Sequence, residues 1–288
     1  MHAADLSIVL VALVAAAVTG GIGYGFSSIT VPVALLVYTG RVLNPALVIL
    51  ELVINGLALF TNRRALRVAF QRVRPLLPGL LPGVIAGSLA LAWVDTGLLR
   101  IVTFAILLPL ILLQSAGLRR PLASERAVGL PFGLALGALY GATTISGPPL
   151  ALFFNNQGLT KDEFRASLGL FRVAESACTV AAYLALGIFT RPALLLSASL
   201  APAVLVGLPL GYLALRKVAA QSFRRACMGL DALLVGFGLA RTLVERHLVP
   251  APVAWAGLAA VAVLEVLILT SLALGRPQAP ARLTGEAR

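Results

Sequence analysis

The chain has 288 residues, of which 59% are hydrophobic and only 12% are charged, and its mean hydropathy is +0.97. These values lie outside the range of soluble globular domains and exclude that class. The apolar residues form blocks of about 20 residues, the length of helix that spans a hydrocarbon core about 30 Å thick. The composition therefore predicts an all-α, polytopic helical membrane protein and not a β-barrel.

The net charge of +12 is the second constraint on function. In a soluble protein it would suggest nucleic acid, but here the basic residues lie between the apolar blocks, without the interleaved aromatic residues of a base-stacking surface. Topology and contact with membrane lipids account for such a pattern. We therefore expect no nucleic-acid partner.

No motif for a metal, a cofactor or a catalytic triad occurs in the sequence. The two histidines, His2 and His247, are peripheral, and the two cysteines, Cys178 and Cys227, lie within apolar blocks. HExxH and GxxxxGK are both absent. The sequence predicts no cofactor, no metal and no enzyme, with a membrane-embedded enzyme kept as the remote alternative.

Two of the nine apolar blocks are interrupted by glycine and proline. The first is divided at Gly20 to Gly25 and at Pro32, and the fifth at Gly141 and at Gly147 to Pro149. A broken backbone inside a bilayer is tolerated only where protein or a water-filled cavity surrounds it. The two interruptions therefore predict the binding site. The blocks cover about 6–38, 45–60, 75–94, 98–117, 127–154, 164–188, 192–215, 223–243 and 251–274.

The two halves of the chain resemble each other. Matched pairs in the same order are Gly20 with Gly137, Ser27 with Thr144, Pro32 with Pro149, Pro78 with Pro202, Gly83 with Gly207 and Gly87 with Gly211. This predicts a duplication. Its parts are a first repeat (1–118), a cytoplasmic linker (119–126), a second repeat (127–244), an extra C-terminal span (245–274) and a disordered tail (275–288).

The basic loops predict how the repeats are inserted. In the first half Arg63 to Arg74 form a basic loop, and the loop Asp95 to Gly97 has no basic residue. In the second half the order is reversed, because the loop at Arg191 is poor in charge and the next one, at Arg216 and Lys217, is rich. Basic loops stay cytoplasmic. The repeats are thus expected to have inverted topology, each starting with a broken, re-entrant hairpin, with the C-terminus cytoplasmic.

Glycines recur four residues apart in two blocks, as Gly79, Gly83 and Gly87 and as Gly129, Gly133, Gly137 and Gly141. Residues with this spacing share a helix face, and small residues there let helix backbones approach closely. These stripes predict helix packing.

Hydroxyl side chains gather at both interruptions. A helix that restarts after a break presents free N–H groups and the positive end of its dipole, which suits an anion. The hydroxyls could bind that anion or could cap the broken helices, and the sequence leaves both roles open. They are Ser27, Ser28, Thr30, Thr143, Thr144 and Ser146.

Three ionisable residues within the blocks are candidates for transport chemistry. Arg172 and Glu175 lie three apart and could form an internal ion pair, or Arg172 could hold an anionic substrate that Glu175 orients or supplies with a proton. Glu51 could carry a proton or make a structural hydrogen bond. Glu51 and Glu175 are therefore the predicted proton-coupling residues.

The stretches Gly20-Gly-Ile-Gly-Tyr-Gly-Phe-Ser-Ser with Pro32 and Gly137-Ala-Leu-Tyr-Gly-Ala-Thr-Thr-Ile-Ser-Gly-Pro-Pro149, in a duplicated layout, resemble the TauE/SafE family of sulfite exporters. The resemblance implies a multi-pass transporter of a bacterial or archaeal inner membrane. Its substrate would be sulfite or a small organosulfonate such as sulfoacetate, generally moved outward. A passive anion channel is the alternative, and a homodimer is left open.

Overall fold

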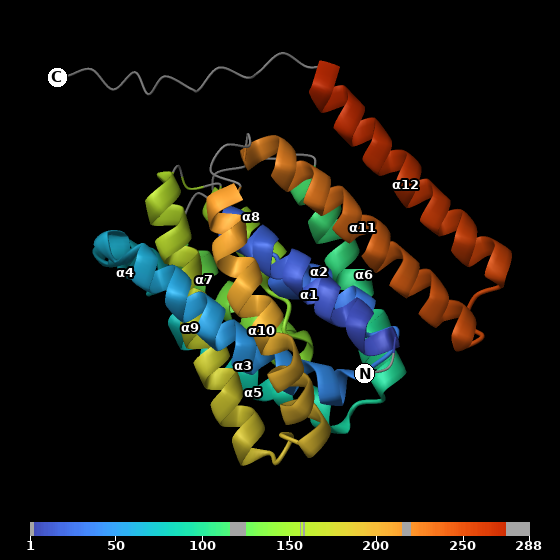
Figure 1. Ribbon diagram of the computed structural model, residues 1–288, viewed down its shortest axis with the longest axis horizontal. Coiled ribbons are helices and arrows are strands. Elements are labelled where there is room, and N and C mark those ends of the chain that lie inside the picture. Colours follow the sequence, from blue (N-terminus) through green and yellow to red (C-terminus); the bar gives the residue numbers. More distant parts are fainter. Residues whose placement is uncertain (1–2, 116–124, 156, 158, 215–219, 275–288) are drawn as a thin grey trace.

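The computed structural model describes residues 3–115, 125–155, 157, 159–214 and 220–274, which form a helical bundle (Figure 1). The predicted tail 275–288 and most of the predicted linker 119–126 lie outside these residues. The helices are α1 (Ala3–Ile22), α2 (Phe26–Ala34), α3 (Gly40–Thr61), η1 (Arg63–Ala65), α4 (Leu66–Val73), α5 (Leu77–Trp93), α6 (Thr96–Ser115), α7 (Glu125–Thr143), α8 (Gly147–Asn155), α9 (Lys161–Ala185), α10 (Arg191–Ala214), α11 (Ala220–Glu245) and α12 (Ala251–Leu274).

Five of the described helices, α3, α6, α9, α10 and α12, are each long and apolar enough to cross a membrane. The segment of η1 and α4 with α5 forms a further bent pair, with an angle of 80° between its two parts. The prediction of a polytopic helical membrane protein is therefore confirmed. Figure 1 shows α12 at the edge of the bundle beside α11.

Both predicted interruptions are present, but proline does not cause them. The first break is Gly23 to Gly25, where Gly23 has φ +101° and Gly25 has φ +119°, values that an L side chain rarely adopts. Pro32, expected to divide the block, lies inside α2, so that part of the prediction is wrong.

The second break runs over residues 144–146, and Thr144 has φ +58°. Gly141, expected at the interruption, lies within α7. Pro148 and Pro149 lie in the first turn of α8, where a missing N–H removes no helical hydrogen bond. The prolines therefore start the second arm and do not interrupt it.

The basic loop after α3 contains a short helix that the sequence analysis missed. In α4, Ala69 and Val73 are buried four residues apart, and the helix packs against α9. Its arginines gave the segment the composition of a polar loop. A single buried pair of residues on a short helix does not form an apolar block, so the helix was not predicted.

The helix contacts occur in matched pairs across the two halves. The helix α5 packs on α7 and α9, and its counterpart α10 packs on α1 and α3. In the same way α6 packs on α8, and α11 packs on α2. Three further contacts, α2 with α8, α3 with α9 and α6 with α11, each join a helix to its expected counterpart in the other half. Each half therefore uses the other half to complete its core.

The glycine stripes of α5 and α7, and Gly211 of α10, lie where helix backbones approach each other closely. A Cβ atom at Gly83 would lie 2.3 Å from the carbonyl oxygen of Leu134 on α7, and one at Gly211 would lie 1.7 Å from that of Ala17 on α1. Real Cβ atoms do not approach backbone so closely. The prediction that these glycines serve helix packing is confirmed.

One end of the bundle is held by an exposed ion pair between loops. The Arg246 guanidinium donates to Asp95 at 2.6 Å, and this hydrogen bond lowers the pKa of the Asp95 carboxyl below its usual value. Arg41, at the start of α3, also donates to the carbonyl oxygens of Leu91 and Val94. The start of α3, the end of α5 and the end of α11 thus meet at this end.

Candidate functional site

The two breaks face each other in the interior. The short helices α2 and α8 pack together. A Cβ atom at Gly147, the first residue of α8, would lie 3.6 Å from the Ser28 hydroxyl oxygen and 3.7 Å from Nη1 of Arg172. The starts of both helices and one guanidinium therefore meet at one place.

Glu51 of α3 is the centre of the polar cluster. The Arg172 guanidinium of α9 donates through Nη2 to Glu51 Oε1 at 2.5 Å, and the Ser27 hydroxyl donates to the same oxygen. The Tyr140 hydroxyl of α7 donates to Glu51 Oε2 at 2.5 Å. The side chains of Glu51 and Arg172 are only 1% and 2% exposed. Three donors from three helices thus satisfy one carboxylate away from solvent.

Glu175 makes the corresponding contact at the second break. The Ser146 hydroxyl, just before α8, donates to Glu175 Oε2 at 2.5 Å, and Glu175 Oε1 is buried without a hydrogen bond partner among the described residues. The Tyr140 and Ser176 hydroxyls are 2.8 Å apart and connect the two sides. Each long helix, α3 and α9, therefore turns a carboxylate toward the start of the short helix in its own half.

The ion pair of Arg172 crosses between the halves. The spacing of Arg172 and Glu175 allowed an ion pair between them, because the two residues share a helix face. In the structure the partner is Glu51, 121 positions away in the sequence. A pattern search over one helix cannot detect such a pair.

The predicted hydroxyls lie in three kinds of surroundings. Ser27 and Ser146 bond to the carboxylates, and Ser28 lies beside Gly147. Thr143 instead donates to the carbonyl oxygen of Leu139 and accepts from the N–H of Ile145, and Thr144 donates to the carbonyl oxygen of Thr143. Thr30 is fully buried, and its hydroxyl has no partner among the described residues. The two threonines at the second break therefore serve the local backbone.

Several polar residues of this region were not predicted. Tyr140 and Ser176 join the cluster, and two others bind the end of α7. The Asn44 amide donates to the carbonyl oxygen of Ala142 at 2.7 Å, and the Tyr183 hydroxyl donates to that of Gly141 at 2.7 Å. The last turn of a helix leaves its carbonyls unpaired, so a break in mid-bundle needs such donors. Polar residues in otherwise apolar helices near a break are the signal that could have found them.

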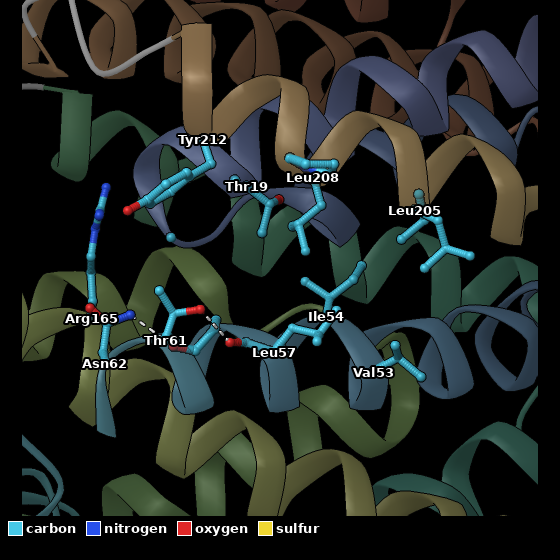
Figure 2. Close-up of a pocket in the computed structure, with 15 residues that line it drawn as sticks. Thr19, Val53, Ile54, Leu57, Thr61, Asn62, Arg165, Leu205, Leu208 and Tyr212 are labelled. Atoms are coloured by element: carbon cyan, nitrogen blue, oxygen red, sulfur yellow. Dashed lines mark hydrogen bonds between the residues drawn. The ribbon is translucent and has the colours of Figure 1, made fainter. Parts of the chain in front are cut away.

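A cavity of about 420 Å³ lies beside the first break, between α1, α3 and α10. Figure 2 shows its polar end, with Asn62, Arg165 and Tyr212, and its apolar end, with Val53 and Leu205. The guanidinium of Arg165 donates to the carbonyl oxygen of Gly21, next to the break. The broken backbone at Gly23 therefore lies beside Arg165, at the polar mouth of this cavity.

A second, more polar cavity of about 770 Å³ continues from that mouth. It shares Thr61, Asn62, Arg165 and Tyr212 with the first and adds Arg63 and Arg64. The side chains of Glu51, Arg172 and Glu175 line neither cavity and are at most 2% exposed. The polar cluster is thus occluded, with a weakly basic vestibule on one side, lined by three arginines and two acids: Arg63, Arg64, Arg165, Asp162 and Glu163. No group of three or more metal-ligating side chains is found in the described part of the chain.

Comparison with known proteins adds one finding. A family model described as "Sulfite exporter TauE/SafE" matches residues 8–239, which include both breaks and every residue of the polar cluster. No curated protein and no solved structure matches the chain.

Proposed function

This chain belongs to the TauE/SafE sulfite exporter family, and from that premise we propose that it is a secondary transporter of a small anion. The family implies membrane transport of sulfite-type anions. Sulfite, or a small organosulfonate such as sulfoacetate, is the proposed substrate, and export is the proposed direction. The proposed location is the inner membrane of a bacterium or archaeon.

The observation that supports this most is the buried position of Arg172 at the junction of the two breaks. A guanidinium binds oxyanions through forked, charge-assisted hydrogen bonds. The starts of α2 and α8 add N–H groups and dipoles of the favourable sign. An intramembrane arginine placed at two helix starts has the donor set that a sulfonate or sulfite needs. Ser27, Ser28 and Ser146 would then complete the contacts.

The matched helix contacts support a mechanism of alternating access. We infer that the halves are inverted repeats that rock against each other around the anion. Loop contacts agree with this topology: Asp95 meets Arg246 at one end, and Arg63 shares a cavity with Thr160 and Asp162 at the other. The basic vestibule would then open to the cytoplasm, since basic loops stay on that side.

Cysteine accessibility in whole cells tests the inverted topology. We expect Arg64→Cys to be labelled by an impermeant maleimide only after the membrane is opened, and Arg191→Cys to be labelled in intact cells. Both changes are made in a variant without native cysteines. Labelling of both positions from the same side would contradict the inverted arrangement, because the two loops would then share a membrane face.

Flux in proteoliposomes tests the function itself. We expect sulfite uptake into vesicles to saturate and to run against its gradient when an imposed pH gradient drives it. A channel gives flux that never exceeds equilibrium, and an enzyme gives a chemically altered product, so product analysis accompanies the assay. Flux that ignores the pH gradient would remove the proton-coupling role proposed for Glu51 and Glu175.

A further inference from the structure

The surroundings of Glu51 point to a role beyond that of a proton carrier. Resting on the proposed function, we propose that the Glu51 carboxylate occupies the place of the substrate's oxygens in this conformation. The transported anion binds Ser27, Tyr140 and Arg172 only when Glu51 has left them. Glu51 is then an internal competitor that a proton removes.

The donors around Glu51 are arranged as in an anion-binding site. Ser27 at the start of α2, Tyr140 on α7 and Arg172 on α9 all donate to one buried carboxylate. Converging hydroxyl and guanidinium donors form the kind of site that binds a carboxylate, sulfite or sulfonate group. The two oxygens of Glu51 therefore mark where two oxygens of an anion can be held.

Arg172 has an N–H donor, at Nε, that Glu51 does not use. Its Nε is buried without a hydrogen bond partner among the described residues, although a guanidinium has five N–H donors. Nη2 and Ser27 hold Oε1 of Glu51 and Tyr140 holds Oε2, so neither oxygen is left for Nε. An anion with three oxygens can engage both nitrogens of the fork. The site thus fits an XO₃-type anion better than it fits the side chain now bound there.

The charges of the cluster determine when an anion can enter it. Arg172 is one positive charge and Glu51 is its ion-pair partner, so the guanidinium charge is already balanced while Glu51 holds it. Adding an anion to a buried cluster whose positive charge is already paired is strongly unfavourable. A proton from solution that neutralises Glu51 ends its ion pair and leaves Arg172 free for the anion. One proton and one anion therefore enter together and leave together.

The other helices packed on α3 bring no competing charge to this place. The helix α5 contains no ionisable residue, and α10 contains Arg191 at its start and Tyr212, which lines the vestibule. Arg100 of α6 interacts with Glu245, Arg241 and Arg246. Tyr140, Arg172 and Glu175 are thus the ionisable groups with which Glu51 shares the site.

The test is sulfite affinity of the purified full chain, without oxygen, at several pH values. We expect Glu51→Gln to bind sulfite about tenfold more tightly than the natural protein above neutral pH, because the competitor is gone. The ratio of the two affinities measures how strongly Glu51 competes with sulfite for its three donors. Taking the ratio at each pH cancels the titration of sulfite itself.

Two controls separate displacement from a general effect of charge. Glu245→Gln removes the acid of the exposed pair with Arg241 and should leave the affinity unchanged. Glu175→Gln changes a buried carboxyl group that does not hold Arg172 through a hydrogen bond, and it should strengthen binding less than Glu51→Gln. Equal gains for the two buried variants, or no gain for Glu51→Gln, overturn the inference.

Failure of this inference can be told apart from failure of the proposed function. If the natural protein moves sulfite and Glu51→Gln binds it no more tightly, transport stands and the internal competitor falls. If Glu51→Gln does not fold, Glu51→Asp provides the test, because the shorter carboxylate stretches its bonds to all three donors. An unchanged sulfite affinity in folded Glu51→Asp then overturns the inference.

Discussion

Replacing Arg172 with alanine is expected to weaken sulfite binding by about 30-fold or more and to abolish transport. The guanidinium is 2% exposed and holds Glu51 at 2.5 Å, so its loss also leaves a buried carboxylate without its counter-charge. Removing one partner of a buried pair costs about 3 to 5 kcal/mol of folding free energy. Thermal unfolding in detergent measures that cost, and sulfite flux in vesicles measures the function.

The double variant Arg172→Ala with Glu51→Gln separates the two effects. It has no unpaired buried charge, so much of the stability should return, while transport should remain absent if Arg172 binds the anion. Arg241→Ala is the matched control, because it breaks an ion pair of 2.6 Å whose side chains are 43% and 46% exposed. Such exposed pairs contribute at most about 1 kcal/mol. Transport by the double variant would show that Arg172 has only a structural role.

Features that repeat along the chain were predictable from the sequence. Glycine at every fourth position indicates close helix packing whatever the partner is, and stretches of glycine and hydroxyl residues indicate breaks. The structure has both breaks, at Gly23 to Gly25 and at residues 144–146. The exact start and end of each break depended on positive φ values at Gly23, Gly25 and Thr144, which side-chain patterns do not encode.

Contacts between distant helices were not predictable in this way. Glu51, Tyr140 and Arg172 were each visible as polar residues in apolar blocks, but nothing in their spacing shows that they meet. Their meeting depends on which helix packs on which, and so on the fold as a whole. The candidate residues could therefore be named from one sequence, whereas the partner of Arg172 required coordinates.

The stability of the bundle should depend strongly on Gly83, which lies where α5 packs on α7. A Cβ atom there would lie 2.3 Å from the carbonyl oxygen of Leu134. A backbone atom cannot move away by changing a side-chain rotamer, so the helices themselves would have to shift. Overpacking of this kind costs about 1 to 3 kcal/mol, and more where backbone must shift. Gly83→Ala is expected to lower the unfolding temperature clearly. Gly211→Ala should do the same at the contact of α10 with α1, since a Cβ there would meet Ala17 at 1.7 Å.

Gly56→Ala is the matched control, because this glycine lies within α3 and a Cβ atom there has nothing within 4 Å. Alanine also has the better helix propensity, so the control should be neutral or slightly stabilising. If Gly83→Ala and Gly211→Ala unfold at the same temperature as Gly56→Ala, the helices are not in close contact at these stripes. The breaks would then lose their support, because α7 and α1 lead directly into them and are held there by α5 and α10.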